Sequence, residues 1–554
     1  PHLQMSKQVN QNDQSVELVR EIYTDKVMIR LRDMGMSALL WQFALPAMIA
    51  NAIAAVTSSY ETSIQKDVIG SAGVTSTSLI QPLELILTMY ISVGLSGGLV
   101  SFISPALGNN DFQTAQKYLM HFMALYLFVA IVVPLCTVTW MPTIVLGLGA
   151  LEGSQTAELA TQYGYIVFGL GTVVYFVNYG FGNILRAMSR SIFNAVKQVC
   201  TFLIQLLLIW LSYKFIVDKN NIQMYANGMS IVIANFITGI AVLLLFIPFK
   251  KILRTFKLKF SWKALKPFDW RMIRDICYYA IPDWITQFQI PITILTANAI
   301  IAALADSASQ NNWDLTVLGI AYKMSPLVCI SNQSFGYAFG PSFGYAIGAR
   351  NWKRAREAMR LTFLWSTGIC LLFFIVMNVS VETFCLALMQ GYQPMSDDVA
   401  FGFRVYNAMM PLLPCFIMMN DIYQMEQKPL KSILVQLSRL VGIVFFELVL
   451  GYATKSTKAV YYAFLAGDAI GCAVGIVTWI HRYKVLGKLE RNEITSEQAG
   501  IRVVSASNGK VRAPKQTVEA VKMKEQTLYA AKVNPELYEA DMLNNPITDA
   551  PTRQ

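Results

Sequence analysis

Charged side chains are scarce inside the long apolar stretches of this 554-residue chain, and the few that lie there could do chemistry. An ionisable side chain at membrane depth costs about 3 kcal/mol on insertion scales, so such residues are usually retained for a function. Several of them lie near the predicted ends of the stretches, where a side chain can simply reach the lipid headgroups. The ten residues are Glu61, Glu84, Asp283, Lys323, Glu382, Arg404, Asp421, Arg439, Glu447 and Asp468.

Glu61 is distinguished by its position in the first apolar stretch, about four helical turns beyond Pro46. Neighbouring stretches contain the amide side chains of Asn178, Asn183 and Gln205. A carboxylate among amide oxygens could hold Na⁺ or take up a proton. We therefore predict a cation-coupling site formed by these four polar residues. The alternative is that Glu61 is simply an acid at the membrane interface.

Two prolines interrupt apolar stretches at matching places. Pro46 lies in the first stretch and Pro282 in the seventh. A proline inside a helix removes one backbone donor and permits a bend. We predict that both residues are helix hinges for alternating access, with a static kink as the alternative.

The cysteines and histidines indicate neither catalysis nor metal binding. No two of the eight cysteines form a C-x-x-C pair, and His2, His121 and His481 lie at segment edges or near the start of the chain. Neither a metal site nor a disulfide framework is implied. The sequence also lacks a His–Asp pair, a Cys–His arrangement and a Gly-rich phosphate loop. We expect no enzyme, no metal site and no cofactor apart from Na⁺ or H⁺ as coupling ion.

The elements that must position these residues are membrane-spanning helices. Apolar residues make up 55% of the chain and charged residues 14%, against roughly a quarter charged in soluble domains. This excludes a disordered protein, a soluble nucleic-acid binder and a disulfide-stapled secreted domain. Runs of about 20 apolar residues cross a membrane as helices, which satisfy their own backbone groups. We predict an all-α integral membrane protein with twelve transmembrane helices, beginning near Ala38, Thr77, Leu119, Ala160, Ile192, Ala226, Ile276, Leu315, Met359, Ala400, Ser432 and Lys458.

The basic residues indicate the orientation of these helices. Twenty-five Lys and Arg residues fall in the N-terminal segment and the even-numbered connections, against five in the odd-numbered ones. By the positive-inside rule, both termini are cytoplasmic. We expect a multi-pass protein of the cell membrane whose basic stretches contact lipid headgroups, with no nucleic-acid partner.

Three motifs recur in the same order and at nearly equal spacing in the second part of the chain. They indicate duplication of a six-helix unit, and because six is even the two copies are parallel repeats with a binding cavity between them. The pairs are Ala44-Leu45-Pro46 with Ala280-Ile281-Pro282, Ala106-Leu107-Gly108-Asn109-Asn110-Asp111 with Ala346-Ile347-Gly348-Ala349-Arg350-Asn351, and Leu185-Arg186-Ala187 with Tyr423-Gln424-Met425.

The duplication divides the chain into five predicted parts. Two six-helix lobes span residues 38–249 and 276–483. A cytoplasmic segment, residues 1–37, precedes the first lobe without a cleavable signal peptide, and a basic, aromatic-bearing linker, residues 250–275, joins the lobes as an interfacial helix. Residues 484–554 form a polar cytoplasmic tail, largely disordered.

Taken together, these motifs resemble the multidrug and toxic compound extrusion transporters. The resemblance covers roughly residues 36–482, and the order and duplicated spacing of the motifs make it fairly specific. It implies two six-helix lobes arranged in a V, which export amphipathic, often cationic organic compounds in exchange for Na⁺ or H⁺. We expect a monomer in membrane lipid with a small organic substrate. The matching segments are Ala44-Leu45-Pro46 with Glu61 and Gly70, Gly94-Leu95-Ser96-Gly97-Gly98 with the loop that follows, Asn183-Ile184-Leu185-Arg186-Ala187 and Leu437-Ser438-Arg439.

Departures from the family pattern leave the coupling ion open. The first-span acid is usually Asp, and here it is Glu61. The family's Asn and Asp of the fifth span are matched by Gln205 and Ile209, and the acid has Ala297 as its counterpart in the second lobe. Charge in the second lobe could come instead from Asp283, Glu447 or Arg439.

Other functions are less well supported. A flippase of lipid-linked saccharides, in the same superfamily, is the alternative, but it needs a strongly cationic cavity and few cations lie at span depth. A sugar porter is disfavoured because the loop from Pro105 to Lys117 contains no Arg.

Overall fold

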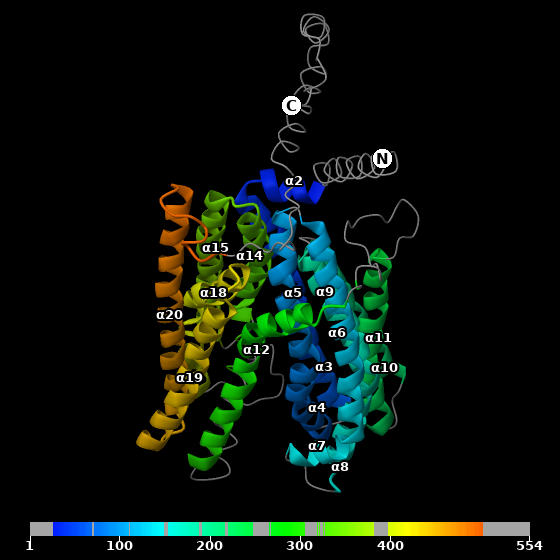
Figure 1. Ribbon diagram of the computed structural model, residues 1–554. Helices are drawn as coiled ribbons and strands as arrows, with labels where there is room; N and C mark the ends of the chain where they lie inside the picture. The colour runs from blue at the N-terminus through cyan, green and yellow to red at the C-terminus, as the bar shows by residue number, and fades with distance from the viewer. Residues whose placement is uncertain are drawn as a thin grey trace, which may run out of the picture. The chain divides into compact units, whose positions relative to one another are not determined.

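The computed structural model is built from helices throughout its described part (Figure 1). It describes residues 26–68, 71–109, 111–148, 153–187, 191–215, 220–246, 268–304, 327–381 and 397–501, with the single residues 265, 318, 321 and 325.

The first half of the chain forms the helices from α2 to α11. Two of its spans contain a π-helical turn, which connects α4 to α5 and α8 to α9 without a break. The elements are α2 (Lys26–Asp33), α3 (Met36–Val68), α4 (Ser71–Glu84), η1 (Leu85–Tyr90), α5 (Ile91–Gly108), α6 (Phe112–Thr139), α7 (Met141–Gly147), α8 (Gln155–Gly164), η2 (Tyr165–Gly171), α9 (Thr172–Ala187), α10 (Ser191–Phe215) and α11 (Asn220–Phe246).

The second half forms the helices from α12 to α20. A short 3₁₀ turn, η4, joins α17 to α18. The elements are α12 (Trp270–Leu304), α14 (Ile330–Gly348), α15 (Trp352–Val379), α17 (Asp397–Asn407), η4 (Met410–Leu412), α18 (Leu413–Met425), α19 (Pro429–Thr454) and α20 (Ala459–Glu490).

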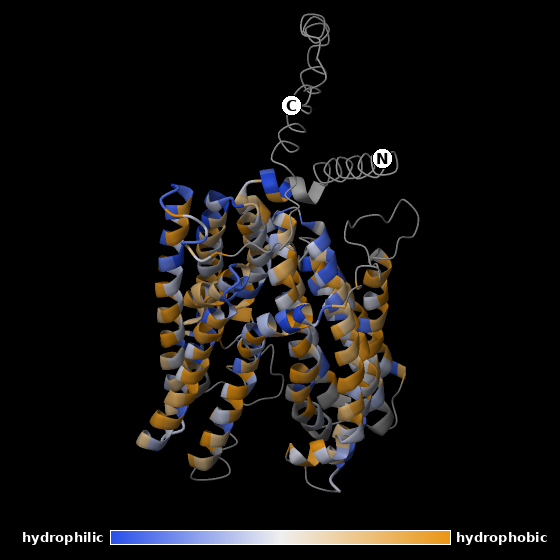
Figure 2. Cartoon of the chain, viewed as in Figure 1, coloured by the Kyte–Doolittle hydropathy of each residue, from blue (hydrophilic) through white to orange (hydrophobic). Residues whose placement is uncertain are grey.

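Eleven helices in the described part of the chain are long and apolar enough to cross a membrane. Large apolar side chains such as Phe128, Leu135 and Val441 are at least 60% exposed, as expected of faces that contact lipid. Hydrophilic residues gather on α2 and near the upper ends of α15 and α20 (Figure 2). The predicted all-α membrane architecture is therefore confirmed.

The eighth of the twelve predicted spans is not among these eleven. Its predicted start near Leu315 lies outside the described residues, and α14 is its described part. Most of α14 is buried inside the protein. A helix enclosed by other helices does not need a lipid-compatible surface, so polar residues such as Ser331 and Asn332 can be accommodated by hydrogen bonds to Ser366 and Met410.

The predicted repeat recurs in the backbone geometry of two turns. After α5, Asp111 donates its N–H to Ala106 and caps α6 by accepting from Thr114 N. After α14, Asn351 donates to Ala346 and caps α15 by accepting from Arg354 N. Equivalent residues of the two motif copies thus make the same hydrogen bonds.

The two halves meet through four helices. These are α3 and α12, the first long helix of each half (called the lead helices below), and α5 and α14, which belong to the second span of each half. α5 packs against both α12 and α14, and α14 packs against α3. Glycines permit the close approach, because a Cβ at Gly108 would lie 2.3 Å from the carbonyl oxygen of Tyr345, and one at Gly348 would lie 2.1 Å from that of Pro105. At the lower end of Figure 1, α12 and α19 lie apart from α4, α7 and α8.

Helix ends differ slightly from the predicted lobe limits. The lead helix of the second half starts at Trp270, slightly before the predicted limit, and α20 continues to Glu490. Residues 1–25, most of the linker before residue 268, and residues 502–554 lie outside the described residues. The five predicted parts of the chain stay predictions.

Candidate functional site

Glu61 is held by amide side chains from two other helices. This partly buried residue lies on α3. Gln205 Nε2 on α10 donates to Glu61 Oε2 at 3.3 Å, and Asn227 Nδ2 on α11 donates to Glu61 Oε1 at 3.2 Å. The predicted pairing with Gln205 is therefore present. Asn227 was not predicted, although it is a polar residue in an apolar stretch and could have been considered on that ground.

A second carboxylate lies close to this site. Glu84 ends α4, and its side chain accepts from the hydroxyl of Tyr175 at 2.9 Å and from that of Tyr163 at 3.4 Å. The two glutamates interact electrostatically. The first half thus brings two carboxylates together in a setting of amide and hydroxyl donors.

Asn178 and Asn183 hydrogen bond elsewhere. Asn178 Nδ2 donates to Asn235 Oδ1 at 2.5 Å, and its backbone oxygen accepts from the buried Lys197 Nζ at 2.9 Å. Asn183 Nδ2 donates to Ser96 Oγ at 2.7 Å. Five residues apart on one helix, the two side chains point about 140° apart. Neither contacts Glu61 through a hydrogen bond in the described structure, so the predicted set of four is divided.

Asp283 lies where the two halves meet. Its Oδ1 accepts from Asn420 Nδ2 at 2.5 Å. Its Oδ2 is buried without a hydrogen-bond partner among the described residues, next to Gly97 of α5. Asp421 and Arg186 are close enough to interact with it electrostatically. This acid was predicted as charge in the second lobe, and the structure places it at the contact with the first half.

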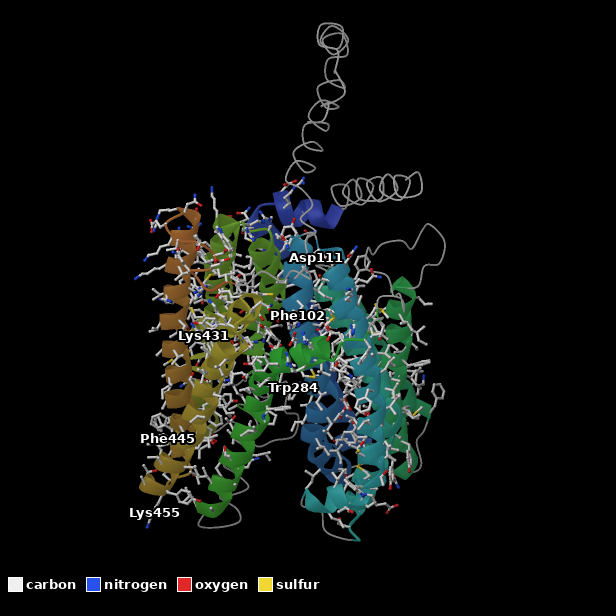
Figure 3. All side chains as sticks on the ribbon, in the orientation of Figure 1. Phe102, Asp111, Trp284, Lys431, Phe445 and Lys455 are labelled. Carbon is white, nitrogen blue, oxygen red and sulfur yellow. The ribbon has the colours of Figure 1, made fainter. Side chains whose placement is uncertain are left out.

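An aromatic residue marks the same contact. Trp284 Nε1 donates to the backbone oxygen of Ile91 at 3.4 Å, and the indole lies against Gly94. Figure 3 shows Trp284 in the middle of the bundle. Nearby, the Arg186 guanidinium lies over the Tyr337 ring, 4.5 Å from its centroid, a geometry that stabilises a cation on an aromatic face.

Arg439 and Glu447, both on α19, have very different surroundings. Arg439 Nε donates to Asp468 Oδ1 at 2.7 Å and its Nη1 to Gln289 Oε1 at 2.8 Å, so its charge is balanced inside the second half. Glu447 is fully buried and accepts from the Thr296 hydroxyl on α12.

The two prolines both lie inside lead helices. Pro46 lies within α3, and Pro282 lies within α12 directly before Asp283. The Thr286 hydroxyl donates to the Pro282 carbonyl at 2.8 Å. α12 changes direction along its length in Figure 1. A bend of this kind is compatible with a hinge or a fixed kink, and the hinge stays a prediction.

Carboxylates in such surroundings are chemically able to take up protons or small cations. Within the described residues, no group of three or more His, Cys, Asp or Glu side chains is arranged to hold a metal ion. The amide, hydroxyl and carboxylate groups of these sites come from several different helices.

Comparison with known proteins identifies the fold. The MatE family model matches residues 46–211 and 292–449. A structure described as the outward-facing conformation of a multidrug resistance MATE family transporter of the MOP superfamily is 16% identical, with 83% of this chain and 98% of that chain covered and a TM-score of 0.73. No curated protein sequence matched the chain.

Further solved structures have the same fold. A MATE structure in complex with MaL6 is 16% identical, covers 83% of this chain and 99% of its own, and has a TM-score of 0.74. A MOP superfamily transporter from Pyrococcus furiosus, described as having a binding pocket of reverse polarity, is 16% identical with 83% and 98% coverage and a TM-score of 0.74.

Proposed function

Because the chain belongs to the MatE family of transporters, which are not enzymes, we propose that it is a secondary antiporter. It exports amphipathic, often cationic organic compounds in exchange for Na⁺ or H⁺. The observation that carries this proposal is the Glu61 carboxylate, held between α10 and α11 by Gln205 and Asn227. An acid at membrane depth with partners on separate helices is suited to coupling ion binding to helix movement.

Glu61 acts in this mechanism by changing its charge. A bound cation neutralises the carboxylate and changes its interactions with Gln205 and Asn227, which favours the bent, low-affinity arrangement of the first half and releases substrate outward. Cation release restores the affinity for substrate. Linkage requires that the cation and the substrate weaken each other's binding by the same factor. Glu84 adds a second negative charge nearby, which strengthens the site's preference for cations.

The contact between the halves supports a cationic substrate. Asp283 and Asp421 bring two carboxylates there, and Arg186 supplies one positive charge. The Tyr337 ring already has one cation, the Arg186 guanidinium, over its face, and aromatic faces of this kind also attract organic cations. A pyrophosphate-bearing lipid would instead require an excess of positive charge, which disfavours the flippase alternative.

Orientation and assembly are part of the same proposal. Both termini are cytoplasmic by the positive-inside rule, which puts α2 on the cytoplasmic side. Glu61 then lies toward the outer side of α3, and the protein functions as a monomer.

The test is counter-transport in proteoliposomes, with Na⁺ and pH gradients imposed separately. We expect one of the two gradients to drive accumulation of a fluorescent organic cation, and Glu61→Gln to abolish that dependence. Glu158→Gln, which removes an acid at the start of α8, is the matched control and should transport normally. Unchanged coupled transport by Glu61→Gln would remove Glu61 from the mechanism.

A further inference from the structure

Glu447 is a buried acid with no ion-pair partner among the residues that the structure describes. Its side chain is 0% exposed, and it lies on α19 two residues after Phe445, which is labelled in Figure 3. One oxygen, Oε2, accepts from the Thr296 hydroxyl on α12. The other, Oε1, has no hydrogen-bond partner within the described part of the chain. An ionised carboxylate in this setting is costly, so the neutral form is favoured.

The lead helix that contacts Glu447 is α12, and it corresponds to α3, the helix that carries Glu61. The spacing that relates Pro46 to Pro282 makes Ala297 the counterpart of Glu61. Ala297 is fully buried and directly follows Thr296. Where the lead helix of the first half has the Glu61 carboxylate, the lead helix of the second half has Ala297, and the Thr296 hydroxyl lies one position earlier.

The fifth membrane-spanning helix of each half, α10 in the first and α19 in the second, also corresponds in position. α10 packs against α3, and α19 packs against α12. The spacing that relates Leu185 to Tyr423 makes Ile209 the counterpart of Glu447, one helical turn beyond Gln205. Among the described residues, a carboxylate thus lies at the contact between the lead and fifth helices of each half, on the lead helix in the first half and on the fifth in the second.

We propose that Glu447 binds and releases a proton in each transport cycle, as a second coupling site beside that of the first half. The inference rests on the proposed antiport and extends it from one coupling ion to two. The proton is exchanged with the aqueous solution, and the carboxyl alternates between its neutral and ionised forms.

The ligand is a proton because the site has few oxygen atoms. Glu447 and Thr296 bring three oxygens together among the described residues. Hard cations such as Ca²⁺ and Mg²⁺ take about six or more oxygen ligands. A proton needs one acceptor and one hydrogen bond, which this pair supplies.

Thr296 can serve both protonation states without repacking. Its Oγ1 also lies 2.9 Å from the carbonyl oxygen of Thr293 and 3.2 Å from that of Ile292. When Glu447 is ionised, the Thr296 hydroxyl donates to it. When Glu447 is protonated, it donates to Oγ1, and the hydroxyl donates to its own helix instead.

Charged groups on the surrounding helices are engaged elsewhere. The helices that pack against α19 are α12, α18 and α20. Asp468 of α20 is paired with Arg439, while Asp283 of α12 and Asp421 of α18 lie at the contact between the halves. None of these groups, and no described cation, forms an ion pair with Glu447. The protonation of Glu447 is therefore expected to depend on pH and on how the helices around it are arranged.

The test measures how many protons are coupled to one substrate. Proteoliposomes are held at a gradient of one pH unit with the membrane potential clamped at zero, and the final concentration ratio of a fluorescent organic cation is recorded. Each coupled proton multiplies that ratio about tenfold. We expect Glu447→Gln to lower the ratio about tenfold. An unchanged ratio would overturn the proposal, while a wild-type protein driven by neither gradient would overturn the antiport itself.

Glu426→Gln is the matched control. Glu426 is a fully buried acid of the same half, but Arg482 Nη2 contacts its Oε1 at 2.5 Å and Lys428 Nζ its Oε2 at 3.1 Å. Its loss should lower thermal stability and leave the concentration ratio unchanged. A reduced ratio in this control as well would show that any loss of buried charge has the effect, and would count against a specific role for Glu447.

Infrared difference spectroscopy gives a readout that does not depend on transport. Among the carbonyl-stretch bands of protonated carboxyls, one component should be present in the wild type and in Glu426→Gln and missing from Glu447→Gln, whereas any band from Glu61 should remain in all three. Should Glu447→Gln fail to fold, Thr296→Val keeps the carboxyl, removes its hydrogen-bond partner and is expected to shift the band. A band that is missing from the wild type at every pH, or that Thr296→Val leaves in place, would contradict protonation of Glu447.

Discussion

At the scale of single residues, two carboxylates of the first half, Glu61 and Glu84, accept hydrogen bonds from neutral donors. Glu61 accepts from two amide groups and Glu84 from two tyrosine hydroxyls. Hydrogen bonds to an ionised group are stronger than those between neutral groups, but they do not cancel its charge. Such a site gains from binding a cation, which is the property that antiport requires.

Replacement of Asn227 by Ala should reveal which ion is coupled. The substitution removes one donor to Glu61, a change of about 1.5–3 kcal/mol, or roughly tenfold to hundredfold in binding. If the ion is H⁺, a carboxylate that has lost a donor binds a proton more tightly, and half-maximal transport moves to higher pH. If the ion is Na⁺, the lost amide ligand raises the Na⁺ concentration required.

The matched control for this experiment is Asn235→Ala. Asn235 is another buried amide of α11, and it accepts from Asn178. The Asn235→Ala variant should show the same ion dependence of transport as the wild type, measured as uptake over a series of pH values and Na⁺ concentrations. Equal behaviour of the two variants would contradict a role for Asn227 at Glu61.

The buried Arg439–Asp468 pair is expected to be structural. Removing one partner of a buried pair leaves an uncompensated charge and costs about 3–5 kcal/mol. Arg439→Met should therefore lower the thermal unfolding temperature strongly. The double variant Arg439→Met/Asp468→Leu should recover much of the loss, because both charges are gone. A stable single variant would show that the pair contributes little.

At the scale of elements, the lead helices connect the sites to the contact between the halves. α12 carries Pro282, Asp283 and Trp284 in succession where it meets α5, and Thr296 about four turns later where it meets α19. A change of direction at the proline would move the two ends of α12 relative to each other. If Glu447 is protonated as proposed, such a movement would connect it to the contact between the halves.

Replacement of Pro282 by Ala tests whether this bend moves. Alanine restores a backbone donor and favours a straight helix. We expect turnover to fall about tenfold, equivalent to a barrier raised by about 1.4 kcal/mol, with substrate affinity little changed. Pro134→Ala in α6 is the control. Wild-type turnover of the Pro282 variant, measured in proteoliposomes, would indicate a fixed kink.

At the scale of the whole molecule, the two halves are in close contact at the ends of α5 and α14. Backbone approaches backbone there, at Gly108 with Tyr345 and at Gly348 with Pro105. The proposed alternating access requires this contact to open during the transport cycle, so under that proposal the described arrangement is one of at least two states.

A cross-link at this contact should stop transport. A Cβ at Gly344 would lie 2.8 Å from the Cβ of Ser104, so cysteines at both positions need to separate by roughly 1 Å to reach disulfide geometry. We expect oxidation of Ser104→Cys/Gly344→Cys to arrest transport and reduction to restore it. Oxidised wild type, with its eight cysteines, is the control. Continued transport by the cross-linked protein would show that the halves need not part here.

Part of the site could be predicted because Glu61 and Gln205 are polar residues in otherwise apolar stretches. Such residues are costly in a membrane, and they are visible without knowledge of the fold. The partners of Glu84 could not be predicted in this way. Tyrosine is a common residue in membrane helices, so Tyr163 and Tyr175 do not stand out in the sequence. Only the packing of α8 and α9 in the first half brings their hydroxyls to the Glu84 carboxylate.

Residue order alone was enough to predict the helical membrane fold and the family, both of which are confirmed. Apolar run length, loop charge and motif spacing are properties of neighbouring residues and survive without any contact being known. The choice of partners depended on three-dimensional packing, because the face that each helix turns inward is set by all of its neighbours together. For that reason Asn178 and Asn183, five residues apart, hydrogen bond away from Glu61, while Asn227 reaches it from another helix.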